Sequence, residues 1–291
     1  MIFFISIILS IAIELGVKPL ESWRRFDWFS QFTDWVTHQM GSTSLRDGPV
    51  VVLAILAPLL FVIWLISAML GGVWTVFEFA FGVAILSMSL GPSDPVRQTQ
   101  EYISALQDDN ADEAKRHATK ILGREAEEEA AVTAELVKES LFVKVCTSIL
   151  GVFFWFIVLG PVGAALFRLT CLLQERYSGT QSGLANSISD FYRILMWIPA
   201  RFTVLCYAVV GSFVDTLHPF HRPSDFWKRD NEEMLAEAGL ASLHVHIVNP
   251  ELSKDTEVNI DSLLNCLALA KRAVLACITF LAVIVILSWI V

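Results

Sequence analysis

Charged side chains inside apolar stretches are the residues of this sequence best suited to do chemistry. Glu14, Glu78 and Arg168 fall within runs of apolar residues. A charge at membrane depth costs several kcal/mol unless it is paired, so each of these side chains needs a partner. Arginines can bind a phosphate or carboxylate with two hydrogen bonds, and paired carboxylates can position a metal-bound nucleotide.

The same residue types recur at the edges of the apolar runs, and together they form a candidate pocket. Its members are Glu14, Glu78, Glu135, Glu139, Arg168, Arg193 and Arg201. Three interpretations stay open: a structural ion-pair network that fixes helix register, a pocket at the membrane surface that binds a small polar or anionic ligand, and a proton or ion pathway. The break Gly160-Pro161-Val162-Gly163 favours the pocket, because irregular backbone at membrane depth must line a cavity or be buried in protein.

No other motif indicates catalysis or metal binding. The sequence has no P-loop, GxSxG, HExxH or dinucleotide-binding pattern, so no catalytic residue is predicted and the cofactor is left unknown. The histidine pairs within residues 218–221 and 244–246 lack further ligands at metal-site spacing, so no metal site is predicted. The acidic run 125–129 is typical of a solvated helix face, with approach to a divalent cation as the alternative. The five cysteines form no CxxC pair and are interpreted as small apolar residues.

The elements that must position these charges are membrane helices. Hydrophobic residues make up 55% of the chain and charged residues 18%, and the apolar residues are clustered. The sequence predicts an all-α, polytopic helical membrane protein with about five to six spans, a broken or re-entrant helix and a helical cytoplasmic segment. The net charge of −9 argues against nucleic acid as a partner. The expected partners are the lipid bilayer, a small polar or anionic ligand and a cytoplasmic protein.

Five parts are expected along the chain. They are N-terminal membrane spans over 1–90, with an interfacial aromatic helix at 26–40; a helical soluble segment, 91–140; a membrane core, 141–217, with the break and the WIPAR stretch at 197–201; a soluble loop, 218–271; and a C-terminal anchor, 272–291. Within these parts, spans are expected at 49–70 and 197–217, a short helix at 164–173 and a helical stretch at 230–243. The first apolar segment, 1–17, is expected to be retained, because its basic residues follow it instead of preceding it.

Lysine and arginine indicate the topology. Residues 18–48 carry four of these basic residues and residues 91–140 carry six, whereas nothing basic precedes the first apolar segment. This pattern predicts an external N-terminus and places both basic segments in the cytoplasm. The side of residues 176–196 and 218–271 stays open, because it depends on whether the short helix with Arg168 crosses the membrane.

The order and spacing of these features match a known family over most of the chain. The shared features are Glu14 in a short first span, Glu21-Ser22-Trp23 before an aromatic helix, the Gly160–Gly163 break with Arg168, and the stretch 197–201. On these features the chain resembles the AmpE family of bacterial inner-membrane proteins, within the wider superfamily of the cobalamin-biosynthesis membrane proteins CbiB and CobD. The resemblance implies a multi-pass protein of the bacterial inner membrane.

Two functions follow from the resemblance. The preferred one is a regulatory or signalling protein of AmpE type, linked to β-lactamase regulation and cell-wall status, with residues 91–140 as its cytoplasmic face. The alternative is a membrane-bound synthase or transferase related to the cobalamin branch, which joins an aminopropanol unit to a corrin side chain, but acting on a different substrate. The sequence leaves enzymatic activity undecided and leans against it. A small transporter is less favoured, because no inverted repeat is evident.

The cobalamin branch also implies site residues. Its pattern is matched at Gly123-Arg124, Glu135, Glu139, Arg168 and Pro199-Ala200-Arg201, with Glu125 where the branch has Asp, and this adds Arg124 to the candidate pocket. Where the branch has further Asn or Asp residues, this chain has Ser140, Val143, Cys171, Gln174, Tyr192 and Arg193. The framework of charges therefore persists while much of the polar ligand set is replaced, which favours a surviving pocket with a different ligand.

Overall fold

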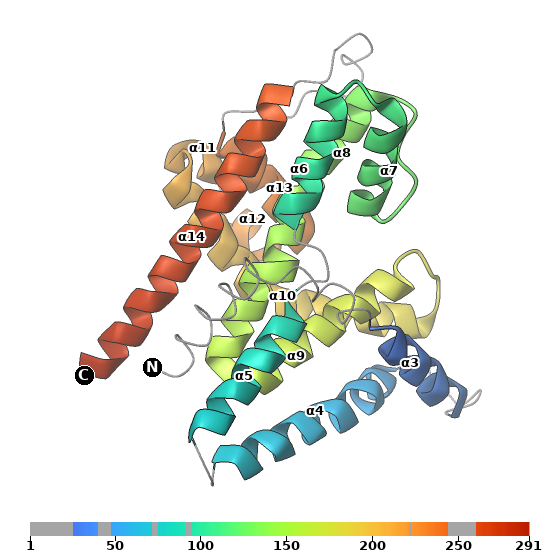
Figure 1. Cartoon of the computed structure of the whole chain (residues 1–291), viewed down its shortest axis with the longest axis vertical. Helices are drawn as coiled ribbons and strands as arrows, with labels where there is room; N and C mark the ends of the chain where they lie inside the picture. Colours follow the sequence, from blue (N-terminus) through green and yellow to red (C-terminus); the bar gives the residue numbers. More distant parts are fainter. Residues whose placement is uncertain are drawn as a thin grey trace. The chain divides into compact units, whose positions relative to one another are not determined.

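The computed structural model describes residues 26–39, 48–71, 75–90, 95–220, 223–243 and 260–290. Over these residues every regular element is a helix, so the predicted all-α membrane architecture is confirmed (Figure 1). The chain divides into two compact units. Unit 1 contains residues 1–92, 151–196 and 282–291, and unit 2 contains residues 93–150 and 197–281.

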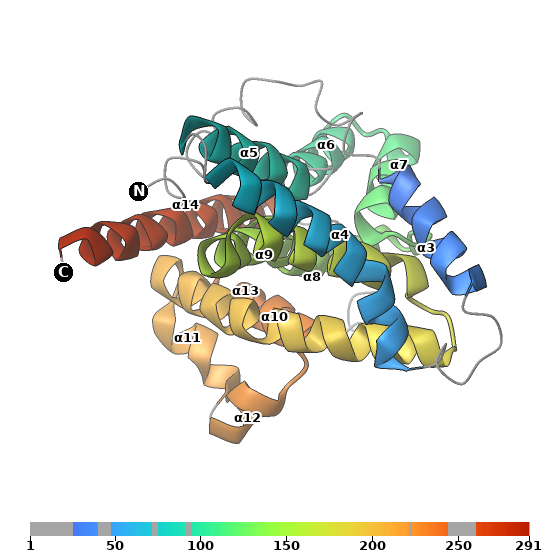
Figure 2. The same cartoon turned by 90° about the horizontal axis from the view of Figure 1, so that it is seen from below.

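Unit 1 is built around α9 (Gly151–Tyr177), against which α4 (Pro49–Gly71) and α5 (Thr75–Ser89) both pack. The short helix α3 (Asp27–Gln39) lies beside α4 (Figure 2). The first part of α10 (Gly183–Val210) also belongs to this unit.

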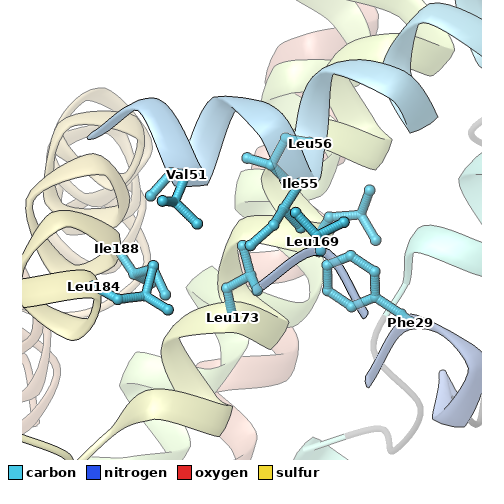
Figure 3. Packing of buried hydrophobic residues seen from close by; sticks show 10 residues of the cluster. Phe29, Val51, Ile55, Leu56, Leu169, Leu173, Leu184 and Ile188 are labelled. Carbon is cyan, nitrogen blue, oxygen red and sulfur yellow. The ribbon is translucent and has the colours of Figure 1, made fainter. Parts of the chain in front are cut away.

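The core of unit 1 joins four of these helices (Figure 3). Phe29 of α3, Ile55 of α4, Leu173 of α9 and Ile188 of α10 are all buried in one cluster. Burying a side chain of this size contributes about 1.5–3 kcal/mol relative to leaving it exposed. The buried side of α3 therefore packs on protein, while Trp35 on its other side is exposed.

The predicted break lies inside α9. Gly160 has φ 66° and ψ −152°, a conformation that favours glycine, and Pro161 removes the next backbone donor. The helix resumes after the break and continues to Tyr177, beyond the short helix expected at 164–173. A Cβ on Gly163 would collide with the carbonyl of Trp155, so the two turns around the break approach closely.

Unit 2 begins with three helices that lie side by side, α6 (Pro95–Gln107), α7 (Ala111–Leu122) and α8 (Ala130–Val145) (Figure 1). The side chain of Asn110 caps the start of α7 by accepting a hydrogen bond from the Glu113 amide at 3.2 Å. Gly123 ends α7 in the left-handed conformation, φ 70°.

A π-helical turn, η2 (Cys146–Leu150), follows α8, and the second part of α10 comes next in unit 2. The unit then contains four short elements and one long helix: α11 (Phe213–Leu217), η3 (His218–Phe220), α12 (Pro223–Lys228), α13 (Asn231–Ala241) and α14 (Ile260–Ile290), whose last residues belong to unit 1. The sequence predicted one helical stretch at 230–243 within this region. The structure has α12 before it, and it packs α13 against α8.

Within the described residues, four helical stretches are long and apolar enough to cross a membrane. They are Pro49–Leu70, Ala130–Tyr177, Gly183–Val210 and Ile260–Phe280, and a further apolar helix, Val76–Ser89, is shorter. The helices α10 and α14 begin well before the spans expected at 197–217 and 272–291. The predicted first span, 1–17, lies outside the described residues.

Candidate functional site

A polar cluster on α8 brings two of the predicted residues together. Glu135 and Glu139 are four residues apart and share one helix face, and Lys138 lies between them. The Lys138 Nζ is 2.5 Å from Glu135 Oε1 and donates to Ser262 Oγ of α14 at 3.3 Å. We call Glu135, Lys138, Glu139 and Ser262 the α8 polar cluster.

The two carboxylates of the α8 polar cluster differ in their pairing. Lys138 is only 3% exposed, and its ammonium is neutralised by Glu135. Glu139 is part-buried, and among the described residues no hydrogen bond or ion pair engages its carboxylate. Two carboxylates and one ammonium leave a net charge of −1. The cluster is therefore suited to a cationic group, and Glu139 is the side chain free to bind it.

Lys138 was missed by the sequence reasoning. It was counted only as a basic residue of the soluble segment, because charged residues are frequent there and usually solvated. The sequence feature that could have predicted its role is its position three residues after Glu135, since side chains at this spacing on a helix can form a salt bridge.

The start of the π-helical turn is tied to α10. The Cys146 amide donates to the carbonyl of Val143, three residues back, instead of to Phe142. The Tyr207 hydroxyl donates to the Phe142 carbonyl at 2.8 Å, and the two rings meet edge to face. Single π turns are frequent near functional sites, and this one directly follows the helix that carries the α8 polar cluster.

Arg201, predicted as a pocket residue, is buried, and its guanidinium forms hydrogen bonds with other residues of the chain. Its guanidinium donates to the carbonyls of Trp197 at 3.0 Å and Trp227 at 3.1 Å, and to the Asn231 side chain. It also lies 4.6 Å from the centre of the Trp197 ring, a cation–π contact. Arg201, the last residue of the Pro199-Ala200-Arg201 stretch that matches the cobalamin branch, therefore joins α10 to the turn between α12 and α13.

Arg124 and Arg193 are on the surface. Arg124 follows the glycine that ends α7 and is 3.8 Å from Glu127, with both side chains exposed. Arg193 pairs with Asp190 at 2.7 Å in unit 1, again with both exposed. Exposed pairs of this kind contribute little, about 0–1 kcal/mol.

The remaining predicted residues belong to unit 1. Arg168 is 2% exposed, and its Nε has no hydrogen-bond partner among the described residues. Glu78 lies in the first turn of α5 and is partly exposed. Glu14 lies outside the described residues.

Two groups of unit 2 outside the spans have shifted pKa values. Burial raises the pKa of Tyr102 on α6 to about 12. Burial also raises the pKa of Glu237 on α13, although the neighbouring Arg229 guanidinium opposes the shift. The Arg229 guanidinium is 2.5 Å from Glu237 and 3.0 Å from Glu233.

No metal centre is visible in the part of the chain that the structure describes. There, no group of three or more His, Cys, Asp or Glu side chains is arranged to hold a metal ion. All five cysteines are buried thiols that form no disulfide.

The fold and the α8 polar cluster define a class: multi-pass helical membrane proteins with a charged cluster at the start of a span. The chain belongs to the CobD/Cbib protein family, whose model matches residues 7–241. This supports the wider CbiB/CobD superfamily of the predicted resemblance, while the narrower AmpE assignment stays a prediction.

Two curated relatives are similar to the chain. Cobalamin biosynthesis protein CobD of Chromobacterium violaceum is 23% identical over 204 residues, which cover 69% of this chain and 64% of the relative. Cobalamin biosynthesis protein CobD of Stutzerimonas stutzeri is 26% identical over 195 residues, covering 65% of this chain and 62% of the relative. The chain thus spans less than two thirds of the length of either relative. No solved structure matches the chain.

Proposed function

We propose that this chain is a membrane-bound synthase or transferase of the CobD/Cbib family whose substrate carries a primary amine. Membership of the family and the names of the two relatives favour this function over the regulatory one. The substrate differs from that of the cobalamin synthases, because several polar positions of their pattern are replaced here.

The observation that carries the proposal is the unpaired carboxylate of Glu139 beside the neutralised Glu135–Lys138 pair. A carboxylate in this position binds an ammonium group through a charge-assisted hydrogen bond. It also accepts the proton when the amine becomes a nucleophile, which is general-base catalysis. In this proposal Glu139 binds and deprotonates the amine, and the Lys138–Ser262 contact orients the cluster.

The cluster also changes the expected chemistry of the ligand. The arginines of the sequence suggested an anionic ligand, but Arg201 is engaged by the backbone and by Asn231. The net charge of the α8 polar cluster instead favours a cationic or amine-bearing group.

Native mass spectrometry of the detergent-purified protein tests the proposal. A small amine-bearing molecule should co-purify with the wild type and be lost from Glu139→Gln. It should be retained by Arg193→Gln, which alters an exposed pair on another helix. If the same molecule stays bound to folded Glu139→Gln, the α8 polar cluster is not its site.

The regulatory function of AmpE type is the second candidate. It is favoured by the replacement of polar positions at Ser140, Val143, Cys171 and Gln174, which removes groups that the cobalamin pattern supplies. Under this candidate the α6–α8 bundle is the cytoplasmic face. Deleting the gene should then alter β-lactamase induction, and unchanged induction and wall-stress responses would remove this candidate.

A further inference from the structure

One face of α10 is apolar and exposed along its second part. Ile198, Leu205 and Val209 are 46%, 46% and 73% exposed, and their spacing of seven and four residues puts them on one side of the helix. The stretch Gly183–Val210 is among the candidate membrane spans. On a helix that spans a membrane, an exposed apolar stripe of this kind is suited to contact lipid.

The exposed apolar residues do not stop where α10 ends. After Val210 it forms α11, where Phe213 and Val214 are 55% and 73% exposed. The apolar surface of α10 therefore continues directly into α11.

The chain then returns along α10 through η3 and α12 (Figure 2). The Trp227 ring of α12 stacks on Trp197 with centroids 5.3 Å apart, and the Trp197 indole donates to the Trp227 carbonyl at 3.3 Å. Because α-helices rise about 1.5 Å per residue, Trp197 lies about 20 Å along α10 from Val210. The segment after the span thus returns from the end of α10 to the level of Trp197.

Several backbone groups of this returning segment have hydrogen-bond partners within the chain. Carbonyls at the end of a helix lack partners of their own, and Arg201 donates to those of Trp227 and Arg229. At the beginning of α11, the Ser212 amide donates to the Ser242 carbonyl at 2.9 Å. Internal pairing of this kind is what backbone near hydrocarbon requires.

We propose that α11, η3 and α12 form a cover along α10 whose exposed apolar side faces the lipid of the bilayer. The occupant of their exposed apolar surface is lipid, because this surface is continuous with the lipid-contacting stripe of α10. Trp197 and Trp227 mark the headgroup region, which tryptophan favours, and the exposed Lys228 beside them can extend its ammonium to lipid headgroups. Arg201 is a positioning residue that makes this placement stable.

Spin labelling tests this proposal in proteoliposomes. All five native cysteines are buried, so single exposed cysteines can be labelled selectively. Val214→Cys and Phe213→Cys carry the label on α11, Phe61→Cys on the exposed side of α4 is the lipid reference, and Arg116→Cys on α7 is the water reference. The collision rates of each nitroxide with oxygen, which partitions into lipid, and with a water-soluble nickel chelate are measured.

Labels at both α11 positions should resemble the Phe61→Cys reference, with frequent oxygen collisions and rare nickel collisions. Frequent nickel collisions, as at Arg116→Cys, would overturn the proposal and make the segment a solvated loop. Exclusion of both reagents at high protein density, but not after dilution with lipid, would also overturn it, because a second copy of the chain would then cover the face.

Discussion

Replacing Arg201 shows whether this arginine stabilises the fold or binds a ligand. Arg201→Ala removes a buried guanidinium that contacts the carbonyls of Trp227 and Arg229 and the side chain of Asn231. If these contacts are its function, the variant loses stability. If its function is to bind a ligand, stability changes little and ligand binding falls.

The expected loss follows from the contacts. Each acceptor left without its donor costs about 1–3 kcal/mol, and the cation–π contact with Trp197 adds about 0.5–2 kcal/mol. These terms do not add fully, because removing the charge also removes its desolvation cost. Breaking a buried charged network by deleting one partner typically costs about 3–5 kcal/mol, which is the loss we expect for Arg201→Ala.

Unfolding by SDS titration in mixed micelles, followed by helical circular dichroism and tryptophan fluorescence, measures this loss. Arg201→Lys should recover only a minor part of the stability, because an ammonium cannot reproduce the planar fork of donors. Arg193→Ala on the same helix is the matched control, and as an exposed pair it should change stability by less than about 1 kcal/mol. A double-mutant cycle of Arg201→Ala with Asn231→Ala should give a coupling of about 0.5–3 kcal/mol.

The reasoning is refuted if Arg201→Ala is as stable as Arg193→Ala. It is equally refuted if the coupling with Asn231 is absent while ligand retention falls.

Three further changes test the packing and charge of unit 2. Tyr207→Phe should lose about 1–2 kcal/mol of stability in the same SDS titration, because the Phe142 carbonyl loses its donor. Tyr102→Phe is the control and should be nearly neutral, because among the described residues no acceptor bonds the Tyr102 hydroxyl. Gly239→Ala should cost about 1–3 kcal/mol, because a Cβ there collides with the Phe142 ring, and Phe142→Leu should recover part of that loss if the collision is its cause. Burial raises the pKa of Glu237 above its ordinary value of 4.5, so the folded protein holds this proton more tightly than the unfolded chain. The resulting stabilisation of the folded state is fully present below pH 4.5. It is lost as the pH rises through the raised pKa. Stability measured against pH should therefore fall less steeply over that window in Glu237→Gln, and an unchanged slope would show that Glu237 does not contribute.

Apolar periodicity and glycine–proline chemistry predicted much of the fold. The span at 49–70 and the helix at 26–40 lie close to the bounds of α4 and α3, because each depends on a local pattern. The break at Gly160 was predictable since Gly-Pro cannot continue a helix without distortion. The early start of α10 at Gly183 was not, because its first turns are polar and become helical through packing of Leu184 and Ile188 in the core of unit 1.

The candidate site was predictable only in part. Glu135 and Glu139, both predicted as pocket residues, lie on one face of α8, a relation that their spacing of four residues in a helix determines. The engagement of Arg201 by the turn near Asn231 could not be predicted, since it joins residues about thirty positions apart through a tertiary fold. The same holds for Lys138, whose contact with Ser262 spans the sequence from α8 to α14.

Binding of a small amine to the reconstituted protein tests the central claim most directly. Saturation-transfer NMR with a simple amino alcohol as the probe, on the wild type and on Glu139→Gln, reports whether the Glu139 carboxylate binds an ammonium group. The account predicts saturation transfer with the wild type and with Arg193→Gln, and its loss in Glu139→Gln. Equal transfer in folded wild type and Glu139→Gln, or none in either, would contradict it.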